Sequence, residues 1–328
     1  MLTYIVRRLA FMIPTLLVIS VVAFAVIELP PGDFLTQQMA QWEELYGDRA
    51  EVMIENMRAI YGLDGSAIER YYRWITRIVF HGDFGRSFLE NTRVTDIIMN
   101  RVFLTMGISL VTLFFTWIVA IPIGVYSAVK QYSFFDYLFT FFAFIGRAFP
   151  NFALALVLMY VAYTYFDWPI GGLMSRSFRG EPLSMAKIAD VARHMVIPVI
   201  VIGTHGLAGL VRVLRAMILD EMNKEYVQTA RSKGLSERVV IWKHVFIIAC
   251  QPIVSTIGWL LPQIVSGAAI VSIVMNLPTT GEALLSALTN QDMYVAASFI
   301  LVLSTLTLIG TLISDLLLAF IDPRIRYN

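Results

Sequence analysis

Long stretches without any Asp, Glu, Lys or Arg are the feature that most constrains this 328-residue chain. A helix needs about 20 apolar residues to cross about 30 Å of hydrocarbon, and backbone in lipid must satisfy its own hydrogen bonds. Charged residues make up 15% of the chain, against about 25% in soluble domains. The sequence therefore predicts an all-α polytopic membrane protein with six transmembrane helices. The predicted spans are 9–27, 102–129, 148–166, 195–211, 252–275 and 293–314.

Two parts of this interpretation leave alternatives. An apolar run-in starts at Tyr137, so five or seven spans also fit the region around the third one. The first block could instead be a cleaved signal peptide, since Arg7 and Arg8 precede it and Ala23-Phe24-Ala25 loosely fits a small-x-small cleavage site. Because the apolar run continues to Leu29, we favour a retained anchor.

The basic residues indicate the orientation, because short cytoplasmic loops are enriched in Lys and Arg. With the N-terminus inside, the internal segments hold twelve of them and the short external loops four. This distribution predicts that both termini are cytoplasmic, although the long external segment carries eight Arg. The predicted organisation is an N-terminal span (1–29), an external segment (30–101) and a five-helix core (102–328) with a cytoplasmic loop near 216–249.

The external segment shows apolar residues at helical spacing, interrupted by Gly62 and Gly65. We expect two short amphipathic helices over the outer face, either as a structural cap or as a contact for an external partner. The residues at helical spacing are Met53, Met57, Ile60 and Tyr61, then Ile68, Tyr71, Tyr72 and Ile75.

The internal loop is the most informative stretch. Gly234 is a typical residue to end a helix, and Ser236 a typical N-cap to begin the next. A short helix, a glycine turn and a second helix would form a compact protrusion whose apolar stripe needs a partner groove. The predicted stripe is Leu219, Met222, Tyr226 and Ala230.

Residues 225–237 read Glu-Tyr-Val-Gln-Thr-Ala-Arg-Ser-Lys-Gly-Leu-Ser-Glu. They resemble the signature loop of permease subunits of ATP-binding-cassette (ABC) importers, in the form seen in the oligopeptide/dipeptide permease family. The general pattern is Glu-Ala-Ala, three residues and Gly. Here Ala230 and Gly234 match the pattern, whereas Gln228 and Thr229 replace its first two residues.

Shorter strings along the whole chain resemble the same family. Their order and spacing imply a type I ABC-importer permease in the inner membrane of a prokaryote. The strings are Arg7-Arg8-Leu9 with Pro14, Leu29-Pro30-Pro31-Gly32-Asp33, Tyr61-Gly62-Leu63-Asp64, Tyr72-Arg73-Trp74, Gly82-Asp83-Phe84-Gly85-Arg86-Ser87 and Asp322-Pro323-Arg324.

The resemblance implies a division of labour among subunits. The chain would pair with a second, similar permease subunit, two ATPase subunits would hold ATP and Mg, and an external solute-binding protein would deliver the ligand. A P-loop needs Gly directly before Lys, and none of the five Lys follows Gly. We therefore expect no enzyme activity and no cofactor in this chain. The residues expected to couple to the ATPase are Met222, Glu225, Tyr226, Ala230, Gly234 and Ser236.

Polar residues inside the spans are costly in lipid and often mark a pathway. We name Arg147, Asn151, His205 and Gln263 as candidates for the translocation path. The alternative for Arg147 is an interfacial position, and for His205 a packed position between helices, beside glycines that permit close approach.

Other functions fit the sequence less well. The four histidines are scattered without metal-ligand spacing, and neither H-E-x-x-H nor G-x-S-x-G occurs. A gradient-driven secondary transporter is the rival from another class, although no convincing internal repeat supports it. Short peptides are the first choice of substrate on the resemblance, with oligosaccharides, nickel complexes or glutathione as alternatives.

Overall fold

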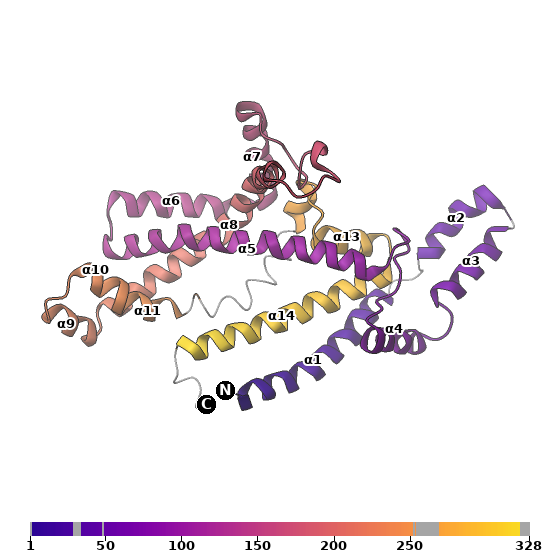
Figure 1. Ribbon diagram of the computed structural model, residues 1–328, viewed down its shortest axis with the longest axis horizontal. Coiled ribbons are helices and arrows are strands. Elements are labelled where there is room, and N and C mark those ends of the chain that lie inside the picture. Colours follow the sequence, from indigo (N-terminus) through magenta and orange to yellow (C-terminus); the bar gives the residue numbers. More distant parts are fainter. Residues whose placement is uncertain (1, 29–33, 48, 252, 254–268, 322–328) are drawn as a thin grey trace. The chain divides into compact units, whose positions relative to one another are not determined.

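The computed structural model describes residues 2–28, 34–47, 49–251, 253 and 269–321 (Figure 1). These residues form helices joined by turns, and no β-sheet forms among them. The elements are α1 (Leu2–Glu28), α2 (Phe34–Tyr46), α3 (Arg49–Tyr61), α4 (Ala67–His81), α5 (Val94–Val129), α6 (Phe134–Ala148), α7 (Asn151–Phe166), η1 (Arg176–Phe178), α8 (Met185–Met222), α9 (Glu225–Ser232), α10 (Glu237–Val239), η2 (Val240–Val245), α11 (Phe246–Ala249), α13 (Thr280–Thr289) and α14 (Met293–Ile321).

Four described helices are long and apolar enough to cross a membrane, namely α1, α5, α8 and α14. The pair α6 and α7 passes the same test together but is bent by 104°. The prediction of an all-α membrane protein is confirmed. The predicted span at 252–275 lies mostly outside the described residues, so the count of six stays a prediction.

The predicted third span, 148–166, corresponds to α7 (Asn151–Phe166), but its first three residues are not part of that helix. Ala148 ends α6, and Phe149 is extended at φ −84° and ψ 137° before Pro150. Proline disfavours helical backbone in the residue before it, so the chain breaks here and α7 starts at Asn151.

The chain divides into two compact units, and α5 and α14 each contribute residues to both. The first unit comprises residues 1–104 and 279–308. One of its cores buries residues of α5 against α13 and α14, including Val94, Ala287 and Phe299. A second core joins Leu35 of α2 and Ile54 of α3 to Phe88 and its neighbours.

The segment predicted to be external (30–101) contains three short helices in its described part, α2, α3 and α4, where the sequence predicts two. The additional helix, α2, pairs with α3 as a hairpin. The predicted breaks at Gly62 and Gly65 are confirmed, since both residues have positive φ. The spacing of Met and aromatic residues did not reveal α2 because its sequence alternates apolar residues with Gln and Thr.

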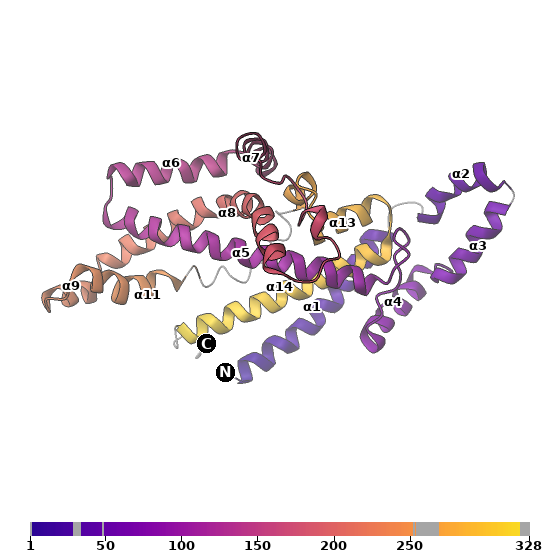
Figure 2. The same cartoon turned by 45° about the horizontal axis from the view of Figure 1, so that its top comes forward.

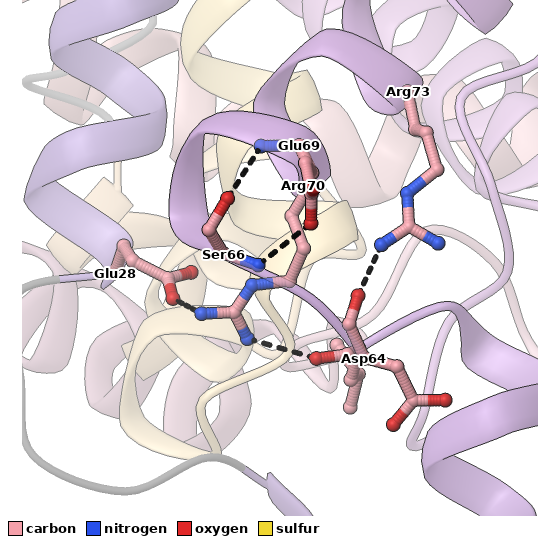
Figure 3. A network of polar contacts seen from close by, with 7 residues as sticks. Glu28, Asp64, Ser66, Glu69, Arg70 and Arg73 are labelled. Carbon is pink, nitrogen blue, oxygen red and sulfur yellow. Dashed lines mark hydrogen bonds and ion pairs between the residues drawn. The ribbon is translucent and has the colours of Figure 1, made fainter.

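Helix α4 has well-defined ends. Ser66 and Glu69 form a reciprocal capping box, and Gly82 adopts the left-handed conformation that ends the helix. Arg70 reaches both Glu28 at the end of α1 and the carbonyl oxygen of Leu63, and Arg73 donates to the carbonyl of Asp64 (Figure 3). The start of α4 is therefore fixed to the end of α1 and to its own preceding turn.

The second unit comprises residues 105–278 and 309–328 and is organised around α8. Both α6 and α7 pack on α8, and α5 meets it at Gly203. A Cβ at Gly203 would lie 2.7 Å from the ring of Phe115, so only glycine allows this close approach. The sequence-based expectation that a glycine here permits close helix packing is confirmed.

Candidate functional site

The segment from α8 to α11 contains the predicted protrusion, which we call the coupling segment (residues 223–249). Its helices gather at the C-terminal end of α8 (Figures 1 and 2). Asn223 caps α8, and after one turn α9 runs over Glu225–Ser232. The helix–turn–helix arrangement predicted from the sequence is confirmed.

Gly234 makes the turn that separates α9 from α10. Its φ is +77°, and its N–H donates to the carbonyl of Arg231 over 2.9 Å. Glycine adopts this left-handed conformation without the steric cost that other residues meet. The predicted helix-ending role of Gly234 is therefore confirmed. Ser236 occupies the N-cap of α10, as predicted, but its side chain makes no capping hydrogen bond.

One side of α9 is buried in the chain's own core. Val227 and Ala230 are buried there, one helical turn apart, together with Leu214 and Ile218 of α8. The predicted apolar stripe is therefore only partly right. Leu219 and Met222 pack against this core, but Tyr226 is exposed and Val227 takes the inward position. The pattern missed Val227 because a stripe through Tyr226 fits the helical period almost as well.

The exposed side of the coupling segment combines apolar and charged groups. Glu225 and Tyr226 lie on this side, and ion pairs join Lys224 to Asp220 over 3.2 Å and Arg231 to Glu237 over 2.7 Å. The larger exposed apolar residues are Tyr226, Leu235, Val239, Trp242 and Ile247. Such a mixed surface beside a rigid buried base suits a protein partner.

Tyr226 connects α9 to the end of α8. Its hydroxyl donates to Oε2 of Glu221 over 2.7 Å. Partial burial and the neighbouring Glu221 carboxylate raise the pKa of Tyr226 well above its usual value. The hydroxyl therefore remains protonated at physiological pH and keeps its role as donor.

A π-helix, η2, follows the short α10 over Val240–Val245. Single π-turns inside helices are rare and occur often at functional sites. Val240, Ile241 and Val245 are buried in the same core as Val227. The sequence gives no signal for this widened turn, because periodicity over six residues does not separate π from α geometry.

The predicted path residues fall mainly at the bend between α6 and α7 and on α8. Arg147 lies in the last turn of α6, and Asn151 is the first residue of α7, where its Oδ1 is buried without a hydrogen-bond partner among the described residues. His205 is exposed on α8. Helices α6 and α8 approach closely at Gly146 and Thr204, since a Cβ at Gly146 would lie 3.1 Å from Thr204. Arg147 and His205 are the residues that follow these two in the sequence. Gln263 lies outside the described residues.

The part of the chain that the structure describes holds no group of three His, Cys, Asp or Glu side chains arranged to bind a metal. The geometry is that of long apolar helices with one charged, compact protrusion. It provides helix packing and one exposed surface of mixed apolar and charged residues.

Comparison with known proteins gives matches along the whole chain. Residues 120–327 match the family of binding-protein-dependent transport system inner membrane components, and residues 1–111 match the N-terminal region of the same type of membrane component. The chain is 34% identical to the oligopeptide transport system permease protein AppB of Bacillus subtilis, over 100% of both chains. It is 30% identical to the dipeptide transport system permease protein DppB of Escherichia coli and 28% identical to the oligopeptide transport system permease protein OppB of Haemophilus influenzae, again over 100% of each.

Proposed function

Because this chain belongs to the family of binding-protein-dependent transport system inner membrane components, we propose that it forms the translocation path for short peptides in an ABC importer. The observation that carries the proposal is the full-length similarity to oligopeptide and dipeptide permeases. As a multi-pass inner membrane component, the chain works with a solute-binding protein and with ATPase partners. We propose that the ATPase partners, and not the solute-binding protein, hold the ATP and Mg.

We further propose that the chain pairs with a second, similar permease subunit and that two ATPase subunits dock on the cytoplasmic side. The coupling segment of this chain would offer Glu225, Tyr226 and the turn at Gly234 to one ATPase. Met222 and Ala230 lie inward, so their part in coupling would be to hold α9 on α8. Ser236 begins the second helix of the protrusion.

The packing supports a simple mechanism for energy coupling. Val227 and Ala230 share one core with Leu214 and Ile218, so we propose that a displacement of α9 would carry α8 with it. Closure of the ATPase pair on ATP would then switch the helix bundle between two states as a rigid-body movement. We propose that Arg147, Asn151 and His205 lie along the path that this movement opens, and we include Gln263 on sequence grounds alone.

The test is uptake by the assembled importer in sealed vesicles supplied with its binding protein. We expect ATPase subunits to copurify with the chain and labelled peptide to accumulate only when ATP is present on the ATPase side. Uptake that follows a proton or sodium gradient without ATP would contradict an ABC importer. Mass spectrometry of the ligand retained by the binding protein tests the cargo separately, since an oligosaccharide, a nickel complex or glutathione there would replace peptide and leave the importer class intact.

A further inference from the structure

Helix α4 carries an unpartnered apolar stripe beside a membrane-spanning helix. Ile68, Tyr72 and Val79 recur at helical spacing and are between 67% and 80% exposed. The opposite side of α4 carries Arg73 and Arg77, while a third side packs on α1 through Tyr71 and Trp74. A helix with an apolar side opposite a basic side is typical of helices that lie in the membrane interface.

The contacts with α1 set the depth of α4. The apolar span of α1 runs over Ile5–Val26, and Tyr71 of α4 is hydrogen bonded to Ser20 over 2.8 Å. Ser20 lies six residues before Val26, which is about 9 Å along a helix that rises about 1.5 Å per residue. Tyr71 therefore lies within the depth of the hydrocarbon. Interfacial helices bury their apolar side about 5–10 Å deep, which agrees with this position.

A second contact sets which way α4 faces. Arg70 is paired with Glu28, which lies beyond the apolar span of α1 on its C-terminal side. The α1 partners of Arg70 and Tyr71 are thus eight residues apart, about 12 Å along the helix. The Arg70 side of α4 faces the headgroups and water, and the Tyr71 side faces the hydrocarbon. The stripe lies next to the Tyr71 side on the surface of α4, so the stripe also faces the hydrocarbon.

The surroundings at this depth are apolar as well. Phe24 of α1 packs with Tyr71 and Trp74 at ring-centroid distances of 5.5 and 5.9 Å. Val21, Val22 and Val26 of α1 are exposed at the same level. Helix α4 therefore packs on α1 at a level where α1, an apolar helix long enough to span a membrane, also exposes apolar side chains.

We propose that α4 is a membrane-interface helix whose stripe of Ile68, Tyr72 and Val79 contacts lipid acyl chains while Arg77 contacts lipid phosphate groups. The exposed Arg77 side chain lies near Tyr294 but makes no hydrogen bond or ion pair with a described residue, whereas the side chains of Arg70 and Arg73 are hydrogen bonded. With three Arg and one Glu, α4 has an excess of positive charge that favours anionic headgroups. This proposal depends on α1 crossing the membrane, and it does not depend on which cargo is transported.

The test uses single-cysteine variants of the assembled importer in vesicles of phosphatidylcholine and phosphatidylglycerol. Cys250→Ser provides the background, since Cys250 is the only cysteine. Fluorescent labels at Tyr72→Cys and Val79→Cys are compared with labels at Leu45→Cys and Val52→Cys. These control residues are exposed apolar positions on α2 and α3, at 72% and 60% exposure.

We expect lipids brominated on their acyl chains to quench the stripe labels at least about twofold more than the control labels, and aqueous iodide to quench them less. We also expect Arg77→Gln to lower the preference of the Val79 label for brominated phosphatidylglycerol over brominated phosphatidylcholine. Arg93→Gln, a change of another exposed Arg in the same unit, should leave that preference unchanged. Equal iodide quenching at Val79 and Leu45 would overturn the proposal. Protection of Val79 from both quenchers would also overturn it, because a protein partner would then cover the stripe.

Discussion

Nη2 of Arg215 lies 3.0 Å from Oδ2 of Asp136, and this ion pair joins α8 to the start of α6. The Asp136 side chain is buried, and Nε of Arg215 also donates to the carbonyl of Ser127 at the end of α5 over 3.3 Å. Three helices of the second unit thus meet at one guanidinium group. Removing one member of a buried ion pair leaves an uncompensated charge.

We therefore expect Arg215→Ala to destabilise the protein by about 3–5 kcal/mol. Asp136→Asn should cost less, because the amide oxygen can still accept from the Tyr132 N–H, as Oδ2 of Asp136 does over 3.0 Å. The melting temperature of the detergent-purified complex measures both effects. The double variant should lose less than the sum of the two single losses, and strict additivity would show that the pair is not coupled.

The contact between α5 and α8 gives a second expectation. Gly203→Ala places a Cβ 2.7 Å from Phe115, so it should cost about 1–3 kcal/mol through overpacking. Gly206→Ala is the matched control on the same helix, since the nearest atom there is 3.9 Å away. We expect Phe115→Leu to recover part of the melting temperature lost in Gly203→Ala. A Gly206→Ala variant that loses as much would point to general intolerance of α8.

Much of the fold follows from residue patterns because lipid imposes strong rules. Uncharged blocks predicted α1, α5, α8 and α14. The sequence did not predict that α8 runs unbroken over 38 residues from Met185 to Met222. Charged residues at both ends of its apolar centre suggested loops, whereas a helix continues through such residues once it leaves the hydrocarbon.

Gly234→Asp tests the coupling segment. A Cβ at Gly234 meets nothing within 4 Å, so the change adds a charge and backbone strain of about 1–2 kcal/mol without a clash. On the proposed function, we expect ATP-dependent uptake to fall about tenfold or more, since about 1.4 kcal/mol of lost docking energy is tenfold in affinity. Membrane insertion should be normal.

Gly180→Asp provides the control for this change. Gly180 also has positive φ, at +81°, and equally open surroundings, but it lies outside the coupling segment. Uptake should survive this substitution. If both variants lose uptake equally, the effect comes from a general loss of stability, and if Gly234→Asp transports normally at equal expression, the coupling role of this turn is wrong.

The sequence predicted the turn of the coupling segment correctly, but it predicted only part of how the segment packs. Gly234 ends one helix and Ser236 begins the next, and such helix ends depend on local sequence, so they can be predicted from it directly. The choice between Tyr226 and Val227 as the inward residue depends on where Leu214 and Ile218 lie, which is tertiary information. The π-turn of η2 is likewise set by packing around Val240 and Val245.

Asp292 predicts a pH dependence of stability in the first unit. Its Oδ2 accepts hydrogen bonds from the Ser87 hydroxyl over 2.6 Å and from the Phe88 and Leu89 N–H groups over 3.0 and 3.3 Å. Burial raises the pKa of Asp292 above its usual value of 3.8, although these hydrogen bonds oppose the shift. The folded protein therefore binds this proton more tightly than the unfolded chain does.

A raised pKa in the folded state means that stability increases as pH falls through the raised pKa toward 3.8 and decreases again as pH rises. Asp292→Asn removes this contribution. We expect the stability of the original protein relative to Asp292→Asn to grow as pH is lowered from neutral, as measured by paired melting curves. A difference between the original protein and Asp292→Asn that shrinks on acidification would mean that the hydrogen bonds outweigh burial and lower the pKa of Asp292.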